Sequence, residues 1–144
     1  GEYGDNNFKL FRAEINKSVN NTIELKLNYE IIHENLDYVF SLLFFNKYGK
    51  LLAFSSITDD CSEEDYKYLT RHGKHDIIVN IDTSSFSSGE YYIEFDFAIH
   101  NLKRIIDSEL KLYFEVFDVR NQRHNSDVRK SLIRLNNFVL KEQI

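Results

Sequence analysis

The clearest alternation of apolar and polar residues in the chain follows the turn residue Gly89 and continues to Ile99. Successive side chains of a β-strand point to opposite faces, so this segment is predicted to be one strand with two different surfaces. The residues predicted to face a core are Tyr91, Ile93, Phe95, Phe97 and Ile99. The opposite surface combines a tyrosine with two carboxylates, which are Tyr92, Glu94 and Asp96. This second surface is therefore the first candidate for a functional surface.

Seven further segments carry strand patterns of their own. Thr22–Tyr29 alternates and predicts a half-buried strand. The largely apolar run Val39–Phe45 predicts a strand that is covered on both faces or meets a partner. The loop after this run contains Gly49 and leads into a second apolar run, Leu51–Ser56, which predicts a hairpin. The remaining predicted strands are Phe8–Ile15, Ile77–Ile81, Leu110–Val119 and Leu132–Leu140.

The order of these elements predicts the fold class. Ser62 is followed by three acidic residues, which predicts a short helix through Leu69. Eight strands without a long helix between them predict an all-β, antiparallel β-sandwich. A length of 144 residues suits a single domain, 1–144, and the leading Gly1 without an initiator methionine indicates a fragment of a longer chain.

The same alternation in neighbouring strands extends the candidate surface. If Leu112 and Phe114 face the core together with Phe95, the alternation places Tyr113 and Glu115 on the outer face, beside Tyr92. In the earlier apolar run, Phe45 belongs to the outward set. The candidate surface therefore consists of Phe45, Tyr92, Glu94, Asp96, Tyr113 and Glu115.

Two functions suit a surface of this composition. Aromatic rings stack on the apolar C–H face of a sugar, and carboxylates accept hydrogen bonds from its hydroxyls. In this interpretation Tyr92 and Tyr113 stack on the sugar, and Glu94, Asp96 and Glu115 accept from it. An apolar sheet face exposed to solvent is also typical of a protein–protein interface. The residues alone leave carbohydrate binding and protein association equally open.

Catalysis by the paired carboxylates is the third possibility. Glu94 and Asp96 are two residues apart on a strand, hence about 6.5–7 Å apart at Cα. Inverting glycoside hydrolysis uses carboxyl groups separated by about 6.5–9.5 Å. That chemistry needs a deep cleft that raises one pKa, and no pattern in the sequence predicts one. Solvated carboxylates are the favoured interpretation, and no enzyme activity is predicted.

The histidines and the cysteine do not predict a metal or redox site. His72 and His75 could form a metal site with Asp59 and Asp60, but polar surface residues of a loop are the favoured interpretation. Cys61 has no evident activating partner and is expected to be inert. No cofactor and no metal are predicted.

The net charge and the cysteine content indicate which binding partners and which cellular compartment suit this chain. A formal net charge of −5 argues against nucleic-acid binding, which normally needs a basic surface. A single cysteine cannot form an internal disulfide, which favours a reducing compartment. The sequence shows no signal peptide and no apolar run long enough to span a membrane.

Several short motifs occur in the order of one known family. The motifs are the Gly4-Asp5 entry into a first strand, Val39–Leu42 leading into Asn46–Leu52, Ser88–Ile93, Leu112–Val116 and Leu132–Leu135. In this order the chain resembles the C-terminal carbohydrate-binding domain of the ATP-binding subunit of O-antigen polysaccharide ABC transporters, the Wzt type. The resemblance covers nearly the whole chain.

The resemblance implies a non-catalytic, immunoglobulin-like sandwich that recognises a lipid-linked glycan, such as an O-antigen polysaccharide, before export. It implies a cytoplasmic location at the inner face of the inner membrane. Contact with the transporter membrane subunit would be made through the parent chain, whose ATPase domain would lie outside residues 1–144. The resemblance also implies a homodimer that forms through the closing strand, Leu132–Leu140.

Overall fold

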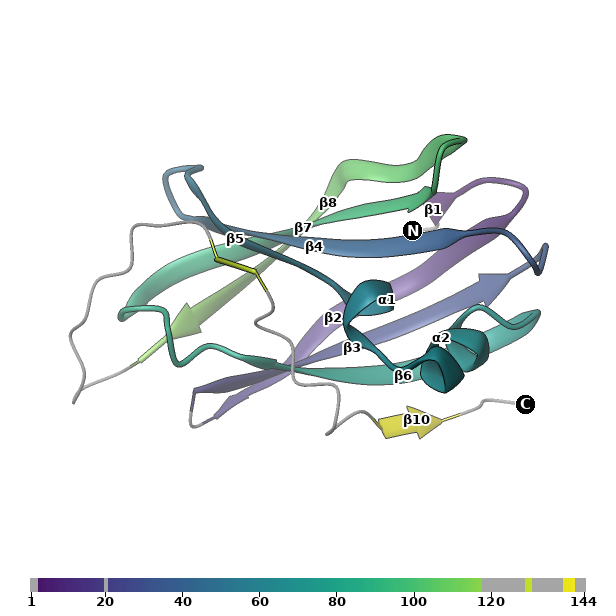
Figure 1. The fold of residues 1–144 in the computed structure, drawn as a ribbon. Helices are drawn as coiled ribbons and strands as arrows, with labels where there is room; N and C mark the ends of the chain where they lie inside the picture. Colours follow the sequence, from purple (N-terminus) through teal and green to yellow (C-terminus); the bar gives the residue numbers. More distant parts are fainter. Residues whose placement is uncertain (1–2, 20, 118–128, 131–138, 142–144) are drawn as a thin grey trace.

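The computed structural model describes residues 3–19, 21–117, 129–130 and 139–141. Their strands form two five-stranded sheets, which pack face to face (Figure 1). The first sheet contains, in spatial order, β1 (Tyr3–Gly4), β2 (Phe8–Val19), β3 (Thr22–Ile31), β6 (Gly73–Asp82) and β10 (Val139–Lys141). The second sheet contains, in spatial order, β8 (Lys103–Val116), β7 (Gly89–Ile99), β4 (Tyr38–Asn46), β5 (Leu51–Ser56) and β9 (Arg129–Lys130). The predicted all-β sandwich is confirmed.

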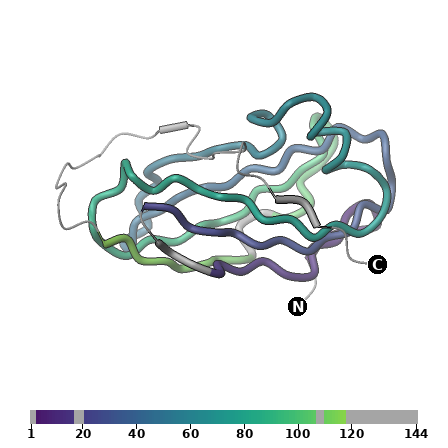
Figure 2. Tube along the Cα trace, turned by 90° about the horizontal axis from the view of Figure 1, so that it is seen from below, coloured from purple at the N-terminus to yellow at the C-terminus, as the bar shows by residue number. Residues whose placement is uncertain are grey.

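Neighbouring strands of the described chain are antiparallel, except for the short parallel contact of β5 with β9. Figure 2, seen from below the view of Figure 1, shows the long strands running along the long axis of the domain. The immunoglobulin-like character of the sandwich stays a prediction of the resemblance.

The predicted strands lie where expected, with some differences at their ends. Strand β5 has the predicted bounds, and β3, β4 and β6 extend the predicted segments by a few residues. Strand β8 begins at Lys103, seven residues before its predicted start, because the residues from Lys103 onward continue the ladder along β7 as far as Ile99. Of the predicted strand Leu132–Leu140, residues 132–138 lie outside the described residues, and Val139 and Leu140 belong to β10. Residues 118–119, at the predicted end of β8, also lie outside the described residues.

Two short helices connect the sheets, α1 (Ile57–Asp60) and α2 (Glu63–Leu69). Helix α2 is the predicted one, and Ser62 caps it by accepting a hydrogen bond of 3.1 Å from the backbone N–H of Asp65. Helix α1 was not predicted, because one turn of helix has too few residues to show a period.

Aromatic side chains fill the core between the sheets. The ring of Phe8 packs against the rings of Tyr29, Tyr38, Phe40 and Phe97, with centroid distances between 5.3 and 6.3 Å. Tyr29 comes from the first sheet and the other three come from the second, so this cluster joins the two layers. Much of the aromatic content of the chain therefore serves the core.

Candidate functional site

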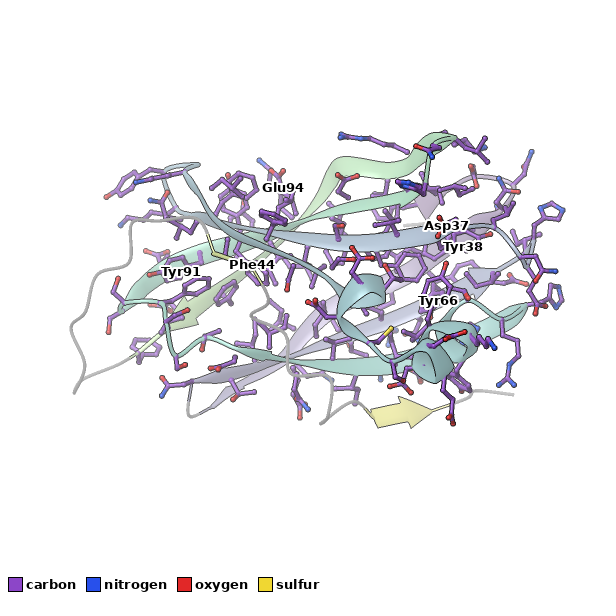
Figure 3. The ribbon with its side chains drawn as sticks, viewed as in Figure 1. Asp37, Tyr38, Phe44, Tyr66, Tyr91 and Glu94 are labelled. Atoms are coloured by element: carbon purple, nitrogen blue, oxygen red, sulfur yellow. The ribbon has the colours of Figure 1, made fainter. Side chains whose placement is uncertain are left out.

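The outer face of the second sheet brings the predicted site residues together. Across β4, β7 and β8 the backbone register places Phe45 beside Tyr92, and Tyr92 beside Tyr113. The next row on the same face places Glu94 beside Lys111. In Figure 3 Glu94 lies on the outer side of the second sheet, whereas Phe44 and Tyr91 point toward the first sheet.

Phe45, Tyr92 and Tyr113 form a continuous line of rings, which we call the aromatic row. The rings of Phe45 and Tyr92 are stacked, with centroids 5.1 Å apart and planes 12° apart. The rings of Tyr92 and Tyr113 are 5.5 Å apart and tilted by 49°. Tyr113 is 71% exposed, so the row ends in a ring that solvent can reach.

Tyr92 differs from Tyr113 in its exposure. It was expected to present its ring to a sugar, yet only 9% of the residue is exposed. Phe45 and Tyr113 cover it from the neighbouring strands, and the ammonium group of Lys111 lies 5.1 Å from the centre of its ring. Alternation predicts the face on which a side chain lies, but it does not show how closely the neighbouring strands cover that side chain. The geometry makes Tyr92 the support of the exposed Tyr113 ring.

The carboxylates on this face have cationic partners. Glu94 is 12% exposed at its side chain, and its Oε2 lies 3.7 Å from Nζ of Lys111. Asp96 is 26% exposed at its side chain, and its Oδ2 lies 3.7 Å from Nη2 of Arg104. Its other oxygen, Oδ1, is buried and has no hydrogen-bond partner among the described residues. These ion pairs hold hydrogen-bonding groups in place beside the aromatic row.

Glu115 completes the predicted set at the edge of the sheet. It is exposed and lies opposite Glu90, the residue before the core-facing Tyr91. Glu90 in turn lies 3.8 Å from Nζ of Lys47 in the hairpin between β4 and β5. All six predicted residues thus share one sheet face, and lysines from two further positions join them.

The paired carboxylates Glu94 and Asp96 line neither of two cavities in the described part of the chain. The larger cavity, about 630 Å³, lies between the β3–β4 loop and α2. The smaller, about 340 Å³, lies on the outer side of the first sheet, between β2, β3 and β6. The carboxylate pair therefore lies outside both cavities, and both of its side chains are largely covered by their neighbours on the sheet face.

His75 does not lie in a surface loop, as the sequence suggested, but in β6, where it is buried. Its ring stacks on Tyr29 with centroids 4.9 Å apart, and its Nε2 lies 2.8 Å from the carbonyl oxygen of Arg71. Among the described residues, no group of three or more histidine, cysteine, aspartate or glutamate side chains is placed to hold a metal ion. His75 is therefore a core residue, whereas His72, Asp59 and Asp60 are exposed, as expected.

Cys61 is a weakly reactive thiol in this structure. Burial raises its pKa to about 11, and the carboxylates of Asp65, Asp59 and Asp60 add to this effect. Its Sγ donates to the carbonyl oxygen of Thr58 at 3.3 Å. At neutral pH the thiol is therefore protonated, and the protonated form is a poor nucleophile.

Sequence reasoning missed two cations that pair with the carboxylates of this sheet face, Lys111 and Arg104. Lys111 has the same parity as Tyr113 and could have been found by extending the alternation by one step. Arg104 could not, because it precedes the predicted start of its strand.

Neither helix of the described part of the chain has the length and apolar character that a membrane span requires.

No family model matches this sequence, and no curated protein matches it significantly. The function of this domain is therefore inferred from the geometry of the outer sheet face and from the motif resemblance.

Proposed function

We propose that this domain is a non-catalytic glycan-binding module and that it binds through the outer face of its second sheet. One observation carries the proposal: Tyr113 is 71% exposed, and its ring lies beside that of Tyr92, which in turn stacks on Phe45. Lys111, Glu94 and Glu115 lie around this ring on the same face. An exposed aromatic ring can stack on the apolar C–H face of a sugar, and the charged groups beside it can form hydrogen bonds with the sugar hydroxyls.

The support of the ring bears on affinity. A ring that is already held in place by its neighbours loses little conformational freedom when a ligand stacks on it. The ammonium group of Lys111 donates hydrogen bonds and the carboxylates of Glu94 and Glu115 accept them, and charged partners make the stronger hydrogen bonds. One stacked sugar with a few such bonds corresponds to millimolar to micromolar affinity, about −4 to −8 kcal/mol.

The order of the sequence motifs supports a wider proposal. In it, the glycan is a lipid-linked O-antigen or a related polysaccharide, and the domain is an immunoglobulin-like part of an ABC transporter at the cytoplasmic face of the inner membrane. The parent chain would carry the ATPase domain and contact the membrane subunit. The closing strand Leu132–Leu140, of which β10 is the described end, would exchange between two copies and pair with β6.

Protein association through the same face is the second candidate. Tyr48, in the hairpin between β4 and β5, is 83% exposed, and Phe117, just after β8, is 76% exposed. Exposed rings at the margin of a sheet face are typical of an interface with another protein. In this alternative, Tyr113 would contact a second copy of the chain or another protein.

A titration with oligosaccharides distinguishes the two. Two-dimensional NMR spectra of the domain are recorded with a panel of neutral and acidic oligosaccharides, for the unchanged chain and for two variants. Tyr113→Ala removes the exposed ring, and Tyr48→Ala is the matched control, a tyrosine of similar exposure outside the aromatic row.

Glycan binding predicts shifts of the amide signals of Lys111, Tyr113 and Glu94 that Tyr113→Ala abolishes and Tyr48→Ala retains. The absence of shifts across the panel, together with self-association that depends on Tyr113, contradicts the proposal and supports the protein interface.

A further inference from the structure

The cleft of about 630 Å³ at one end of the sandwich is separate from the aromatic row. One wall is the tip of the β3–β4 loop, Glu34 to Leu36, and the other is formed by α2 and the turn that follows it. Figure 3 shows Tyr66 of α2 near Asp37 and Tyr38 at this end of the molecule, whereas Phe44 and Tyr91 lie toward the other end. Small-molecule sites have volumes of roughly 300–1,000 Å³, so the cleft has the size of a ligand site.

The wall formed by α2 is held firmly against the core. Leu69 is fully buried, and its carbonyl oxygen accepts a hydrogen bond of 2.7 Å from the hydroxyl of Tyr29. The hydroxyl of Tyr66 donates to the carbonyl oxygen of Tyr38 at 3.3 Å. Burial raises the pKa of Tyr66, and the nearby carboxylate of Asp37 adds to the rise, so this hydroxyl stays protonated at neutral pH.

The loop wall is fixed as well. Leu36 packs against the hydrophobic core, and Asn35 adopts a left-handed backbone conformation with φ of 67°. The Oε1 atom of Glu34 accepts a hydrogen bond of 3.3 Å from the backbone N–H of His72. The two walls are therefore linked to each other, and the cleft between them is formed before any ligand arrives.

The lining combines rings with planar polar groups. Glu64, Lys67 and Tyr68 are spaced at i, i+3 and i+4, which places them on one face of α2. The guanidinium of Arg71 lies 4.7 Å from the centre of the Tyr68 ring, which orients both groups. A ring beside amide, carboxylate and guanidinium groups suits a ligand that is rich in hydroxyls.

The charges of the residues that line the cleft limit the charge of the ligand that it can bind. Three carboxylates line the cleft, those of Glu34, Glu64 and Asp65, against the two cations Lys67 and Arg71. One of the cations, Lys67, also lies 3.8 Å from Glu63 outside the cleft, which reduces its effect inside. An acidic ligand would meet net repulsion here, and an amine-bearing ligand net attraction.

We propose that this cleft is a second ligand site and that it takes a sugar unit which is neutral or bears an amine and which carries no acidic group. The choice of a sugar rests on the proposed glycan-binding function, whereas the existence of the site rests on the cleft itself. Two contacts at separate ends of one domain would let it hold an extended glycan more firmly than either contact alone.

Three sugars that share one ring and differ in charge test the proposal: glucose, glucosamine and glucuronic acid, with the galactose series as a repeat. We expect NMR shifts of Asn35, Tyr66 and Tyr68, strongest with glucosamine and weakest with glucuronic acid. Glu64→Gln keeps the shape of the cleft and removes one charge, and it should weaken glucosamine binding about two- to fivefold while it leaves glucose unchanged. Glu24→Gln, which removes the same charge from a strand of the first sheet, should change neither.

The outcomes separate this inference from the proposed function. Shifts at Tyr113 without shifts around the cleft overturn the second site and leave the first intact. Shifts around the cleft alone support the second site and count against the sheet face. If glucuronic acid binds the cleft as tightly as glucosamine, the proposed ligand class is wrong, and if no sugar shifts either region, both proposals fail.

Discussion

The aromatic row predicts that two tyrosines in adjacent strands, on the same sheet face, contribute very differently to stability. Tyr92 is 9% exposed and lies between two rings and an ammonium group, whereas Tyr113 is 71% exposed. Truncation of a buried aromatic residue to alanine costs about 3–5 kcal/mol in a core. Since Tyr92 lies under a single layer of side chains, we expect Tyr92→Ala to cost somewhat less than this, about 2–4 kcal/mol.

Tyr113→Ala should lower the free energy of unfolding much less than Tyr92→Ala does. The mutation loses one ring contact with Tyr92, about 0.5–1.5 kcal/mol, and little buried area. Urea unfolding followed by circular dichroism measures both values, provided that the variants unfold with the same dependence on denaturant. The expected difference between the two variants is about 2 kcal/mol. If Tyr113→Ala destabilises the domain as much as Tyr92→Ala, then Tyr113 is not the free end of the row, and the proposed binding surface is wrong.

Three further predictions concern ionisable groups. Lys111→Met should lower the free energy of unfolding by about 1 kcal/mol, because it leaves the largely covered Glu94 without its partner. Lys111→Arg, which keeps the positive charge, serves as the control in the same urea assay. An unchanged stability of Lys111→Met would contradict the pairing. Stability should fall as pH rises above 10 toward 12, because burial raises the pKa of Tyr38 to about 12 and that of Tyr29 well above 10. In this range the unfolded chain releases the two hydroxyl protons while the folded chain still holds them. Thermal unfolding at a series of pH values measures this fall, and an unfolding temperature that does not change with pH would contradict it. Alkylation of Cys61 by iodoacetamide at pH 8 should be about 10- to 100-fold slower than that of a free thiol of pKa 9, because its pKa of about 11 lowers the thiolate fraction about 100-fold and the stronger nucleophilicity of that thiolate offsets part of this. A rate equal to that of a free thiol would show that the pKa of Cys61 is not raised.

Most of the sandwich could be predicted from the sequence because a two-residue period is a local property. The strand Gly89–Ile99 shows it most clearly, and the five residues predicted to face the core all lie there. The same rule placed Phe45, Tyr92 and Tyr113 on one face, because their strands are neighbours and share a register. Local patterns also gave α2, since Ser62 and the acids after it form a recognisable helix start.

What could not be predicted depends on contacts between distant parts of the chain. The burial of Tyr92 results from side chains on two other strands, and nothing in its own segment shows them. The cleft at the end of the sandwich brings Tyr66 to Asp37, which is 29 positions away in the sequence. His75 was placed in a loop because the alternation is weak around it, yet β6 begins at Gly73 and carries it into the core.

The charges around the aromatic row bear on the choice between a glycan and a protein partner. The buried centre of a protein–protein interface is generally depleted in lysine, glutamate and aspartate. The outer sheet face has the opposite composition, since Glu94, Asp96 and Lys111 lie within the sheet beside Tyr92 and Tyr113. The ion pair of Asp96 with the exposed Arg104 contributes little to stability, so folding alone gives little reason for it. A sugar, in contrast, needs fixed donors and acceptors beside the ring on which it stacks, and the charge pattern therefore favours glycan binding over protein association.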